Sequence, residues 1–166
     1  MTEATQKKLE ERFRNDSVTF TSFRGCTRVE WSAQRIIELL SYLKLQCGFD
    51  MLVDITAADY LEYPGARDRY SLIYCLASTA TSERIVVKVS LNDPDPVVSS
   101  AVPLWNGANW LEREVYDMFG IRFEGHPDLR RILLPDEFTA FPLRKDYPLR
   151  GRGERHNFPV LTRTES

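Results

Sequence analysis

The segment from Asn109 to Pro148 reads NWLEREVYDMFGIRFEGHPDLRRILLPDEFTAFPLRKDYP, and it opens with a short charged helix. Asn109 stands three positions before Glu112, which is the N-x-x-E form of a capping box, so we predict that the helix begins at Asn109. Gly120 occupies the position where a left-handed residue commonly ends a helix. Apolar residues recur at helical spacing between these ends, and they are Leu111, Val115, Met118 and Phe119.

The chain after this helix, residues 121–166, has a different character. It contains five prolines, nine Lys or Arg residues and seven Asp or Glu residues, without a long helical or alternating pattern. It nevertheless keeps more large apolar residues than a solvated tail would. These are Phe123, Leu129, Ile132, Leu133, Leu134, Phe138, Phe141, Leu143, Tyr147 and Phe158. We predict an extended, Pro- and Arg-rich C-terminal arm over residues 121–166, buried in part against another protein.

Residues 1–120 are predicted to form an α+β domain. Alternating or β-rich segments predict strands at 18–23, 26–31, 51–60, 70–78 and 84–91, with the first two joined as a hairpin. Amphipathic or capped segments predict helices at 2–15, 33–47, 97–102 and 109–119. The short connection between the last two strands favours antiparallel pairing. We therefore expect a two-layer domain with helices on one mainly antiparallel sheet.

Residues at the ends of these elements give more detailed expectations. Ser32 is predicted to cap the helix at 33–47, and Gly48 is predicted to end it. Asp95 and Pro96 have the types expected at the N-cap and first turn of the helix at 97–102. Three tryptophans lie at or near element ends and are predicted to be packing anchors: Trp31, Trp105 and Trp110.

Composition narrows the class of protein. The 166 residues carry a formal charge of −2, which gives no net attraction to nucleic acid or to an anionic membrane. The three cysteines are widely spaced without a C-x-x-C pattern, so neither a disulfide framework nor a four-thiolate cluster is encoded. No apolar run is long enough to span a bilayer, and the N-terminus lacks a hydrophobic signal region. We expect a protein of a reducing compartment without a membrane span.

Two short patterns suggest ligand sites, but their surroundings do not support them. The sequence Gly151-Arg152-Gly153 lies in a basic tail without a following helix, which a phosphate-binding loop needs. His126 and His156 are thirty positions apart, and neither stands in a carboxylate–histidine cluster. We predict that His126 anchors a loop by hydrogen bonds to the backbone.

The acidic residues of the charged helix permit a catalytic and a structural interpretation. Glu112, Glu114 and Asp117, if held together, would have the shifted pKa values of acid–base catalysts. However, Glu112 and Glu114 point roughly 200° apart around a helix and cannot face each other. Arg113 and Asp117 are spaced as an i, i+4 ion pair. The structural interpretation is therefore the stronger one.

Basic residues gather near the end of the arm, and they are Arg144, Lys145, Arg150, Arg152 and Arg155. Against Asp146 and Glu154 they leave a local excess of three positive charges. Such a cluster can contact a nucleic-acid backbone, so a free-standing nucleic-acid-binding protein is one alternative. Arginine also forms paired hydrogen bonds with carboxylates of a protein partner, and the acidic remainder of the chain favours that alternative.

Three motifs give the sequence a resemblance to a known family. They are ERExxDMFG at 112–120, HPDLRRILLP at 126–135 and PLRKDYP at 142–148. Together they resemble the signature of the thirty-kilodalton subunit of respiratory complex I, which is the C subunit of bacterial NADH:quinone oxidoreductase. The three motifs span about forty residues, while the N-terminal half agrees only in length and strand order.

The resemblance implies a role inside a larger enzyme. The complex passes electrons from NADH to quinone and translocates protons, but this chain would carry no catalytic residue and bind no cofactor or metal. NADH, flavin, iron–sulfur clusters and quinone would belong to the assembled complex. The chain would dock on the forty-nine-kilodalton-type subunit (the D subunit) near the quinone-reducing region, peripherally on the cytoplasmic side of the bacterial plasma membrane. Other complex I subunits, and not nucleic acid, are the implied partners.

The resemblance also implies which residues lie at the interface with other subunits. They are Glu112, Arg113, Glu114, Asp117, His126, Arg130, Arg131, Pro142, Arg144, Lys145, Asp146 and Tyr147. As a hypothesis, the charges of the helix fix the start of the arm through pairs with Arg130, Arg131 or the partner. A sister assembly that uses the same type of subunit is a further alternative: a membrane-bound hydrogenase, a coenzyme F420 dehydrogenase or a photosynthetic ferredoxin:quinone oxidoreductase.

Overall fold

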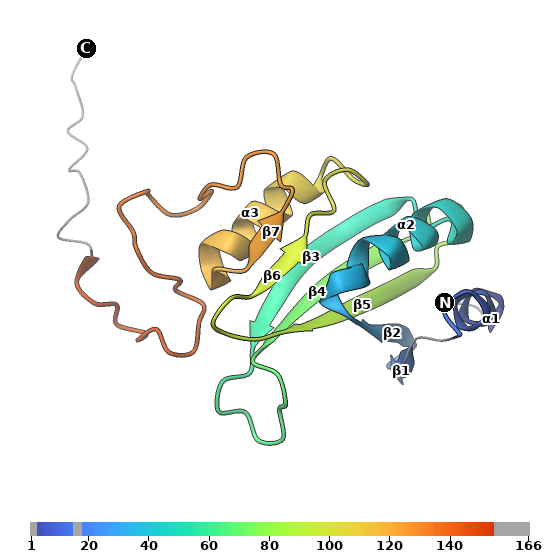
Figure 1. Ribbon diagram of the computed structural model, residues 1–166, viewed down its shortest axis with the longest axis horizontal. Coiled ribbons are helices and arrows are strands. Elements are labelled where there is room, and N and C mark those ends of the chain that lie inside the picture. Colours follow the sequence, from blue (N-terminus) through green and yellow to red (C-terminus); the bar gives the residue numbers. More distant parts are fainter. Residues whose placement is uncertain (1–2, 15–17, 155–166) are drawn as a thin grey trace, which may run out of the picture.

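The computed structural model describes residues 3–14 and 18–154, and its centre is a five-stranded sheet with helices on one face (Figure 1). The helices are α1 (Glu3–Arg12), α2 (Ile36–Cys47) and α3 (Ala108–Phe119), with a short 3₁₀ turn at Ala33–Arg35. The strands are β1 (Thr19–Phe23), β2 (Cys26–Trp31), β3 (Met51–Asp59), β4 (Tyr70–Ala77), β5 (Arg84–Leu91), β6 (Val97–Ser99) and β7 (Arg122–Glu124). The predicted two-layer α+β class is confirmed.

The five-stranded sheet has the order β1-β2-β5-β4-β3. Strands β3, β4 and β5 pair antiparallel, which confirms the pairing that the short connection predicted for β4 and β5, and β1 and β2 form the predicted hairpin. The pairing of β2 with β5 is parallel, because the chain passes through α2 and two further strands between them. The sheet is therefore mainly antiparallel, with one parallel junction in the middle.

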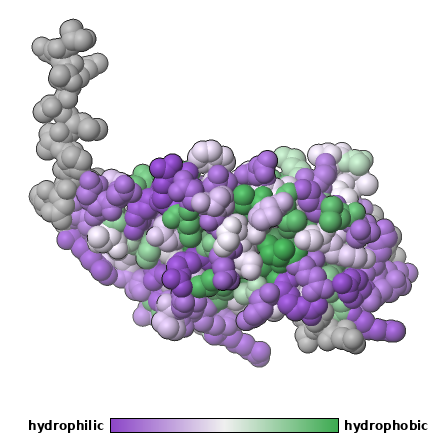
Figure 2. All heavy atoms as spheres, turned by 45° about the horizontal axis from the view of Figure 1, so that its top comes forward, coloured by the Kyte–Doolittle hydropathy of each residue, from purple (hydrophilic) through white to green (hydrophobic). Residues whose placement is uncertain are grey.

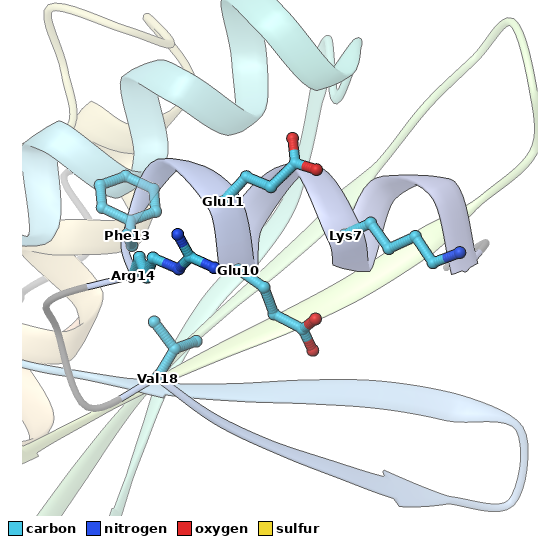
Figure 3. A pocket seen from close by; sticks show the side chains of 6 residues that line it. All are labelled: Lys7, Glu10, Glu11, Phe13, Arg14 and Val18. Carbon is cyan, nitrogen blue, oxygen red and sulfur yellow. The ribbon is translucent and has the colours of Figure 1, made fainter.

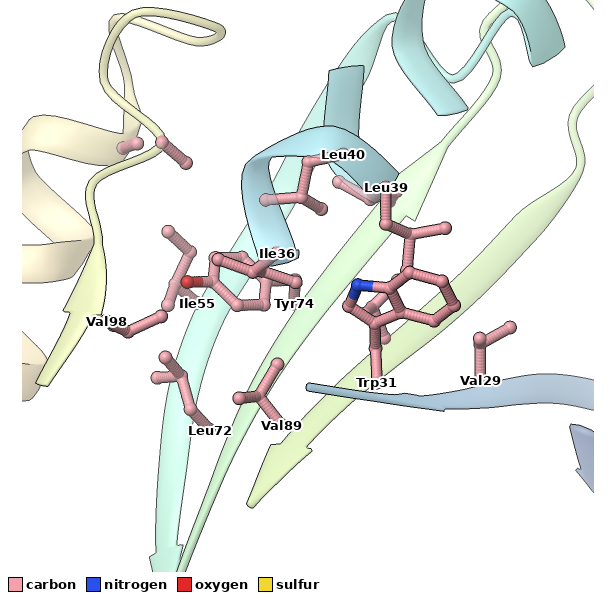
Figure 4. Packing of buried hydrophobic residues seen from close by; sticks show 14 of the residues in the cluster. Val29, Trp31, Ile36, Leu39, Leu40, Ile55, Leu72, Tyr74, Val89 and Val98 are labelled. Atoms are coloured by element: carbon pink, nitrogen blue, oxygen red, sulfur yellow. The ribbon is translucent and has the colours of Figure 1, made fainter. Parts of the chain in front are cut away.

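The core lies between α2 and one face of the sheet (Figure 4). Ile36, Leu39 and Leu40 of α2 are fully buried above the apolar side chains of the central strands, including Leu72 and Tyr74. Leu9 of α1 and Phe13, which directly follows that helix, complete this layer, and the Phe13 ring meets Trp31 edge to face at 4.8 Å. Burial of this apolar surface supplies the main driving force for folding.

The opposite face of the sheet carries polar side chains. Register places Arg28 of β2 beside Val86 of β5, and Glu30 beside Lys88. Arg28, Glu30 and Ser90 are exposed, whereas their strand neighbours Val29 and Val89 point into the core. This alternation is expected for a sheet with one face buried and the other face polar.

The helix predicted at 97–102 is wrong. Val97–Ser99 is β6, which pairs in parallel with β7, a strand formed by the first residues of the predicted arm. Two β-branched valines favour this extended backbone. Asp95 therefore has no helix to cap, and its carboxylate pairs instead with Arg122 of β7 at 2.6 Å. Phe123 of β7 is buried, so the start of the arm is part of the folded core.

Two helix starts also differ from the prediction. Ser32 makes no capping hydrogen bond, and α2 follows a 3₁₀ turn instead. Helix α3 begins at Ala108 after Gly107, so Asn109 is not its cap. The Ala108 N–H donates to the Trp105 carbonyl and the Trp110 N–H to the Gly107 carbonyl. Since a turn of backbone bonds already occupies these donors, α3 needs no side-chain cap.

Candidate subunit-docking site

Helix α3 lies beside β3 and connects the sheet to the arm (Figure 1). Its predicted apolar face is confirmed, because Val115, Met118 and Phe119 are buried and Leu111 packs partly against the core. The charged residues behave differently from a solvated helix face. Glu114 is exposed, whereas three of the charged side chains are buried. These three are Glu112, Arg113 and Asp117. Each has a separate structural task.

Glu112 joins α3 to the chain that follows β6. Its carboxylate accepts hydrogen bonds from the Ser100 hydroxyl at 2.7 Å and from the Ala101 N–H at 2.6 Å. The side chain is completely buried, and the structure gives it no cationic partner among the described residues. Burial raises its pKa to about 7, against the opposing effect of these two hydrogen bonds. Glu112 is therefore an internal anchor, not a group that faces solvent.

Asp117 joins α3 to the arm. One oxygen accepts from the Arg131 guanidinium at 2.6 Å, and the other accepts from three consecutive backbone N–H groups at 2.8–3.1 Å. These backbone donors belong to Ile132, Leu133 and Leu134. Burial would raise the pKa of Asp117, but the N–H groups and Arg131 outweigh it and lower that pKa below its usual value. The predicted pairing between the helix and Arg131 is confirmed.

Arg113 holds the same part of the arm through backbone oxygens. Its guanidinium donates to the Arg130 carbonyl at 3.1 Å and to the Arg131 carbonyl at 2.9 Å. The expected i, i+4 pair of Arg113 with Asp117 is wrong, because the arm supplies a better partner for each of them. Arg113 also lies 5.4 Å from the ring centre of Trp110. Trp110 is exposed, so the packing-anchor prediction holds for Trp31 and Trp105 but not for Trp110.

His126 fixes the turn that follows β7. Its Nε2 lies 3.2 Å from the Asn109 carbonyl, and its Nδ1 accepts from the Asp128 N–H at 3.0 Å. These contacts fit the tautomer with the proton on Nε2. The prediction of a loop anchor bonded to the backbone is confirmed.

The segment 143–146 returns to the end of α3 and to the sheet. The Leu143 N–H donates to the Met118 carbonyl, and the Arg144 guanidinium donates to the Phe119 carbonyl. The Arg144 guanidinium also lies 4.7 Å from the Phe141 ring centre and 5.4 Å from that of Tyr70. This part of the arm is therefore packed on its own chain.

An ionic cluster attaches the same segment to the ends of β3 and β4. The Lys145 N–H donates to Asp59 at 2.9 Å, and Asp146 pairs with Arg69 at 2.8 Å. Arg69 also pairs with Asp59 at 3.1 Å and with Asp93. Burial alone would raise the pKa of Asp59, but Arg69 and the backbone donors lower it. Asp59 and Arg69 were not among the residues predicted from the sequence, although an acid at the end of a strand was a visible signal.

Gly120 allows the arm to lie close to α3. Its φ of +75° is left-handed, as predicted for the end of the helix. A Cβ atom here would lie 2.6 Å from both the Phe141 ring and the Arg144 guanidinium. Gly120 is therefore required both by its backbone conformation and by the close approach of the arm.

The outward side of this region keeps apolar groups in contact with solvent. Its exposed large apolar side chains are Trp110, Ile132, Leu133, Leu143 and Leu149. Exposed charges lie among them, including Glu114, Arg130 and Lys145. Pro142 and Tyr147 are half-buried, and the Tyr147 hydroxyl donates to Glu154 at 2.8 Å. Figure 2 shows hydrophobic and hydrophilic side chains interspersed over the face of the molecule that it draws.

Other candidate features offer less. A groove of about 380 Å³ between α1 and the start of β1 is lined mostly by charged side chains, with the apolar Phe13 and Val18 at one end (Figure 3). In the described ranges, 3–14 and 18–154, no three His, Cys, Asp or Glu residues are placed to hold a metal ion. No described helix is long and apolar enough to cross a membrane. Arg155, His156 and Phe158 lie outside the described residues.

A small α+β domain that fixes an arm on its own surface, and leaves apolar groups on the arm's outer side, has the organisation of one component of a larger assembly. Comparison with known proteins identifies the assembly. The family model described as "Respiratory-chain NADH dehydrogenase, 30 Kd subunit" matches residues 29–153. The chain belongs to this family.

Relatives agree with this assignment. The C subunit of the NADH-quinone oxidoreductase of Trichlorobacter lovleyi is 44% identical over 147 residues, covering 89% of this chain and 90% of the relative. The corresponding subunit of Citrifermentans bemidjiense is 45% identical over 144 residues, covering 87% and 88%. Both relatives match the present chain over nearly their whole length.

Solved structures share the fold. A trypsin-resistant fragment of Nqo5 is 37% identical, with a TM-score of 0.68 over 75% of this chain and 98% of that fragment. A chain of the archaeal membrane-bound sulfane sulfur reductase has a TM-score of 0.74 over 99% of this chain and 96% of its own length. Its identity is 21%, so this second likeness shows the fold alone.

Proposed function

We propose that this chain is a non-catalytic, peripheral-arm subunit of a proton-translocating NADH:quinone oxidoreductase. NADH, flavin, iron–sulfur clusters and quinone belong in this proposal to other parts of the complex. Membership of the 30 Kd subunit family supports the proposal, as do the relatives named as the C subunit of NADH-quinone oxidoreductase. In this proposal the subunit lies on the cytoplasmic side of the plasma membrane and is held there through the assembled complex.

In this proposal, residues 1–120 form a rigid base and the arm, residues 121–166, docks on the D subunit near the quinone-reducing region. The observation that carries it is the division between the two sides of the arm. Inward groups of the arm such as Arg131 and Arg144 are bound to α3, at Asp117 and at the Phe119 carbonyl. Apolar side chains such as Leu133 and Leu143 face solvent, where they are available to a partner.

The predicted interface residues then have two roles. Those bound inside the chain position the arm, and they are Arg113, Asp117, His126, Arg131, Arg144 and Asp146. Glu112 is also bound inside the chain, where it anchors α3 to the segment after β6. Those on the outer side, Glu114, Arg130 and Lys145, contact the partner, with Pro142 and Tyr147 at the edge. Rim charges of this kind steer association and set specificity.

Two alternatives have less support. The fold is shared with a chain of the sulfane sulfur reductase, so the fold alone does not distinguish a sister complex, whereas the family match favours the NADH:quinone enzyme. A nucleic-acid-binding role relied on the basic cluster of the arm. Arg144 is committed to Phe119 and to two aromatic rings, which weakens that role.

The test uses the tagged full-length chain, retrieved from native membranes with its associated subunits identified by mass. Leu133→Ser and Leu143→Ser should each reduce recovery of the D subunit, because they remove outward apolar groups without touching the inner contacts. Leu45→Ser is the matched control, since Leu45 is 70% exposed on α2 and Leu133 is 63% exposed. Equal recovery with all three variants would contradict docking through the arm.

A shortened chain is a second test, and the structure shows at which residue it should end. A chain ending at Ile121 would lose β7 and its pairing with β6. A chain ending at Asp128 keeps β7 and the His126 anchor, and it removes the rest of the arm. The chain that ends at Asp128 should not recover the D subunit.

A further inference from the structure

A second hollow lies at the far end of the sheet from the core helices. The β3–β4 loop, residues 60–69, projects beyond the strands (Figure 1) and encloses about 480 Å³ together with the polar face of the sheet. Tyr60, Tyr63 and the Pro64-Gly65 turn form one wall, and Ser71, Lys88 and Ser90 line the sheet side. Of its lining residues, Tyr70 alone takes part in the arm contacts described above, through its ring and Arg144.

An unpartnered hydroxyl lies in this hollow. Ser71 is 1% exposed, and its Oγ has no hydrogen-bond partner among the described residues. A buried polar group without a partner is costly, and such groups are uncommon in folded proteins. Register places Ser71 directly opposite Ser90, so two hydroxyls lie side by side on the sheet side of the hollow. The site therefore offers donors that the chain itself does not use.

Lys88 adds positive charge to the same wall. Its ammonium is 3.8 Å from the Glu30 carboxylate, which is too far for a good hydrogen bond, and 5.5 Å from the Tyr60 ring centre. Lysine has three N–H donors. With Ser71, Ser90 and Arg67 it forms a donor-rich lining. Two carboxylates, those of Glu30 and Asp68, line the hollow as well, and the Asp68 carboxylate already accepts from the Asn92 side chain at 2.7 Å.

The rim of the hollow has the properties of a protein contact. Tyr63 is 64% exposed and packs edge to face on Tyr60 at 5.6 Å. Exposed tyrosines are frequent anchors of interfaces, because they bury a large area and keep a polar group at the edge. The hollow is also next to the arm attachment, since Tyr70 lines it and carries the Arg144 contact. A partner bound to the arm therefore has this loop within reach.

We infer that the hollow beneath the β3–β4 loop is a second docking site, which receives an acidic side chain of the neighbouring protein subunit. The incoming carboxylate accepts hydrogen bonds from Ser71, Ser90 and Lys88, and Tyr63 closes over it. This inference rests on the proposed function, because it requires a neighbouring subunit held by the arm. The contact at the hollow is separate from the apolar contacts that Leu133 and Leu143 make with the same neighbouring subunit.

The experiment compares four tagged full-length variants by their recovery of the neighbouring subunit from native membranes, with a salt titration of each complex. Ser71→Ala and Lys88→Gln should each weaken retention roughly tenfold, the range expected for a lost hydrogen bond to a charged group. Glu30→Gln should strengthen retention, since it removes one of the two carboxylates that line the hollow. Lys7→Gln, on α1, is the control and should change nothing. The Lys88 effect should shrink as salt increases.

Thermal unfolding of the isolated chain separates docking from folding. Ser71→Ala should not lower the unfolding temperature, because the hydroxyl that it removes has no partner in the described part of the chain. If Ser71→Ala and Lys88→Gln retain the neighbouring subunit normally while Leu133→Ser does not, the hollow holds water only and the inference is overturned. If Leu133→Ser also retains it, the proposed function itself has failed.

Discussion

Two carboxylates of α3, five residues apart, are both fully buried but meet opposite surroundings. Glu112 faces the chain after β6 and is held by one hydroxyl and one N–H. Asp117 faces the arm and is held by a guanidinium and three N–H groups. The pKa of Glu112 is raised to about 7 by burial, whereas the pKa of Asp117 is lowered by its donors despite burial.

This difference shows that donor number and charge, not burial alone, decide which form of a buried acid is stable. The site at Glu112 favours the neutral acid below about pH 7, so in that range it joins two parts of the domain without a charge. The site at Asp117 favours the anion, so it attaches the arm through charge-assisted hydrogen bonds. The two attachments must therefore respond to pH in opposite directions.

Removal of Asp117 tests the stronger attachment. In Asp117→Ala the Arg131 guanidinium and three backbone N–H groups lose their acceptor. We expect a loss of about 3 to 5 kcal/mol in the free energy of unfolding, the range for breaking a buried ion pair. Urea denaturation measures it. Glu114→Ala is the control on the same helix, and it should change stability by less than about 0.5 kcal/mol because Glu114 is exposed. Similar values for both variants would contradict the role of Asp117.

Replacement of Glu112 by Gln tests the opposite pH response. The pKa of Glu112 is higher in the folded chain, about 7, than its ordinary value of 4.5. As pH rises between these values the unfolded chain loses this proton first, so stability falls, by about 3 kcal/mol in total. Glu112→Gln keeps a neutral group and should remove this decline, so the variant should be the more stable protein at pH 8. Unfolding curves from pH 4.5 to 8 measure it, and an unchanged slope would sink the explanation.

Asp117 and Asp59 determine the pH below which the folded chain loses stability in acid. Their pKa values are lower in the folded chain than the ordinary value of 3.8, so their contribution is present above that value. It is lost as pH falls below about 3.8 through the folded pKa values. The Glu112→Gln variant should therefore keep the acid unfolding of the parent chain while it loses the decline above pH 4.5.

Sequence patterns predicted the parts of this molecule that depend on periodicity. The five strands of the main sheet, the α2 stripe that includes Leu39 and the left-handed end at Gly120 all follow local rules of burial and backbone conformation. The strand at Val97–Ser99 was missed, because its partner β7 lies more than twenty residues later and only pairing decides between strand and helix there.

The contacts of α3 were harder to predict for the same reason. Charge spacing along the helix suggested a pair of Arg113 with Asp117, yet both side chains bind the arm, which returns from residues 130–134. Asp59 and Arg69 join the arm only because the fold brings Lys145 and Asp146 to the end of the sheet. Motifs showed which residues matter, whereas the three-dimensional path of the arm showed to what each is bound.

Gly120 sharpens the comparison by testing how close the arm must lie to α3. In Gly120→Ala the new Cβ meets Phe141 and Arg144 at 2.6 Å, and the left-handed backbone is strained as well. Gly65→Ala is a matched control, because Gly65 has a similar φ of +82° but nothing within 4 Å. We expect about 1 kcal/mol of destabilisation at Gly65 and about 2 to 3 kcal/mol at Gly120. Equal losses in thermal unfolding would mean that the arm moves away without cost.

The smallest loss of stability is expected for removal of Asp146, the acidic residue that the arm contributes to an ion pair with Arg69. Asp146 is half-exposed, and its partner Arg69 keeps Asp59 and Asp93 when Asp146 is removed. Asp146→Ala should therefore cost less than about 1 kcal/mol, as exposed ion pairs do, and this cost should fall further in high salt. A double-mutant cycle with Arg69→Gln at low and high salt isolates the pair. A coupling as large as the loss in Asp117→Ala would mean that the sheet end, and not α3, is the main attachment of the arm.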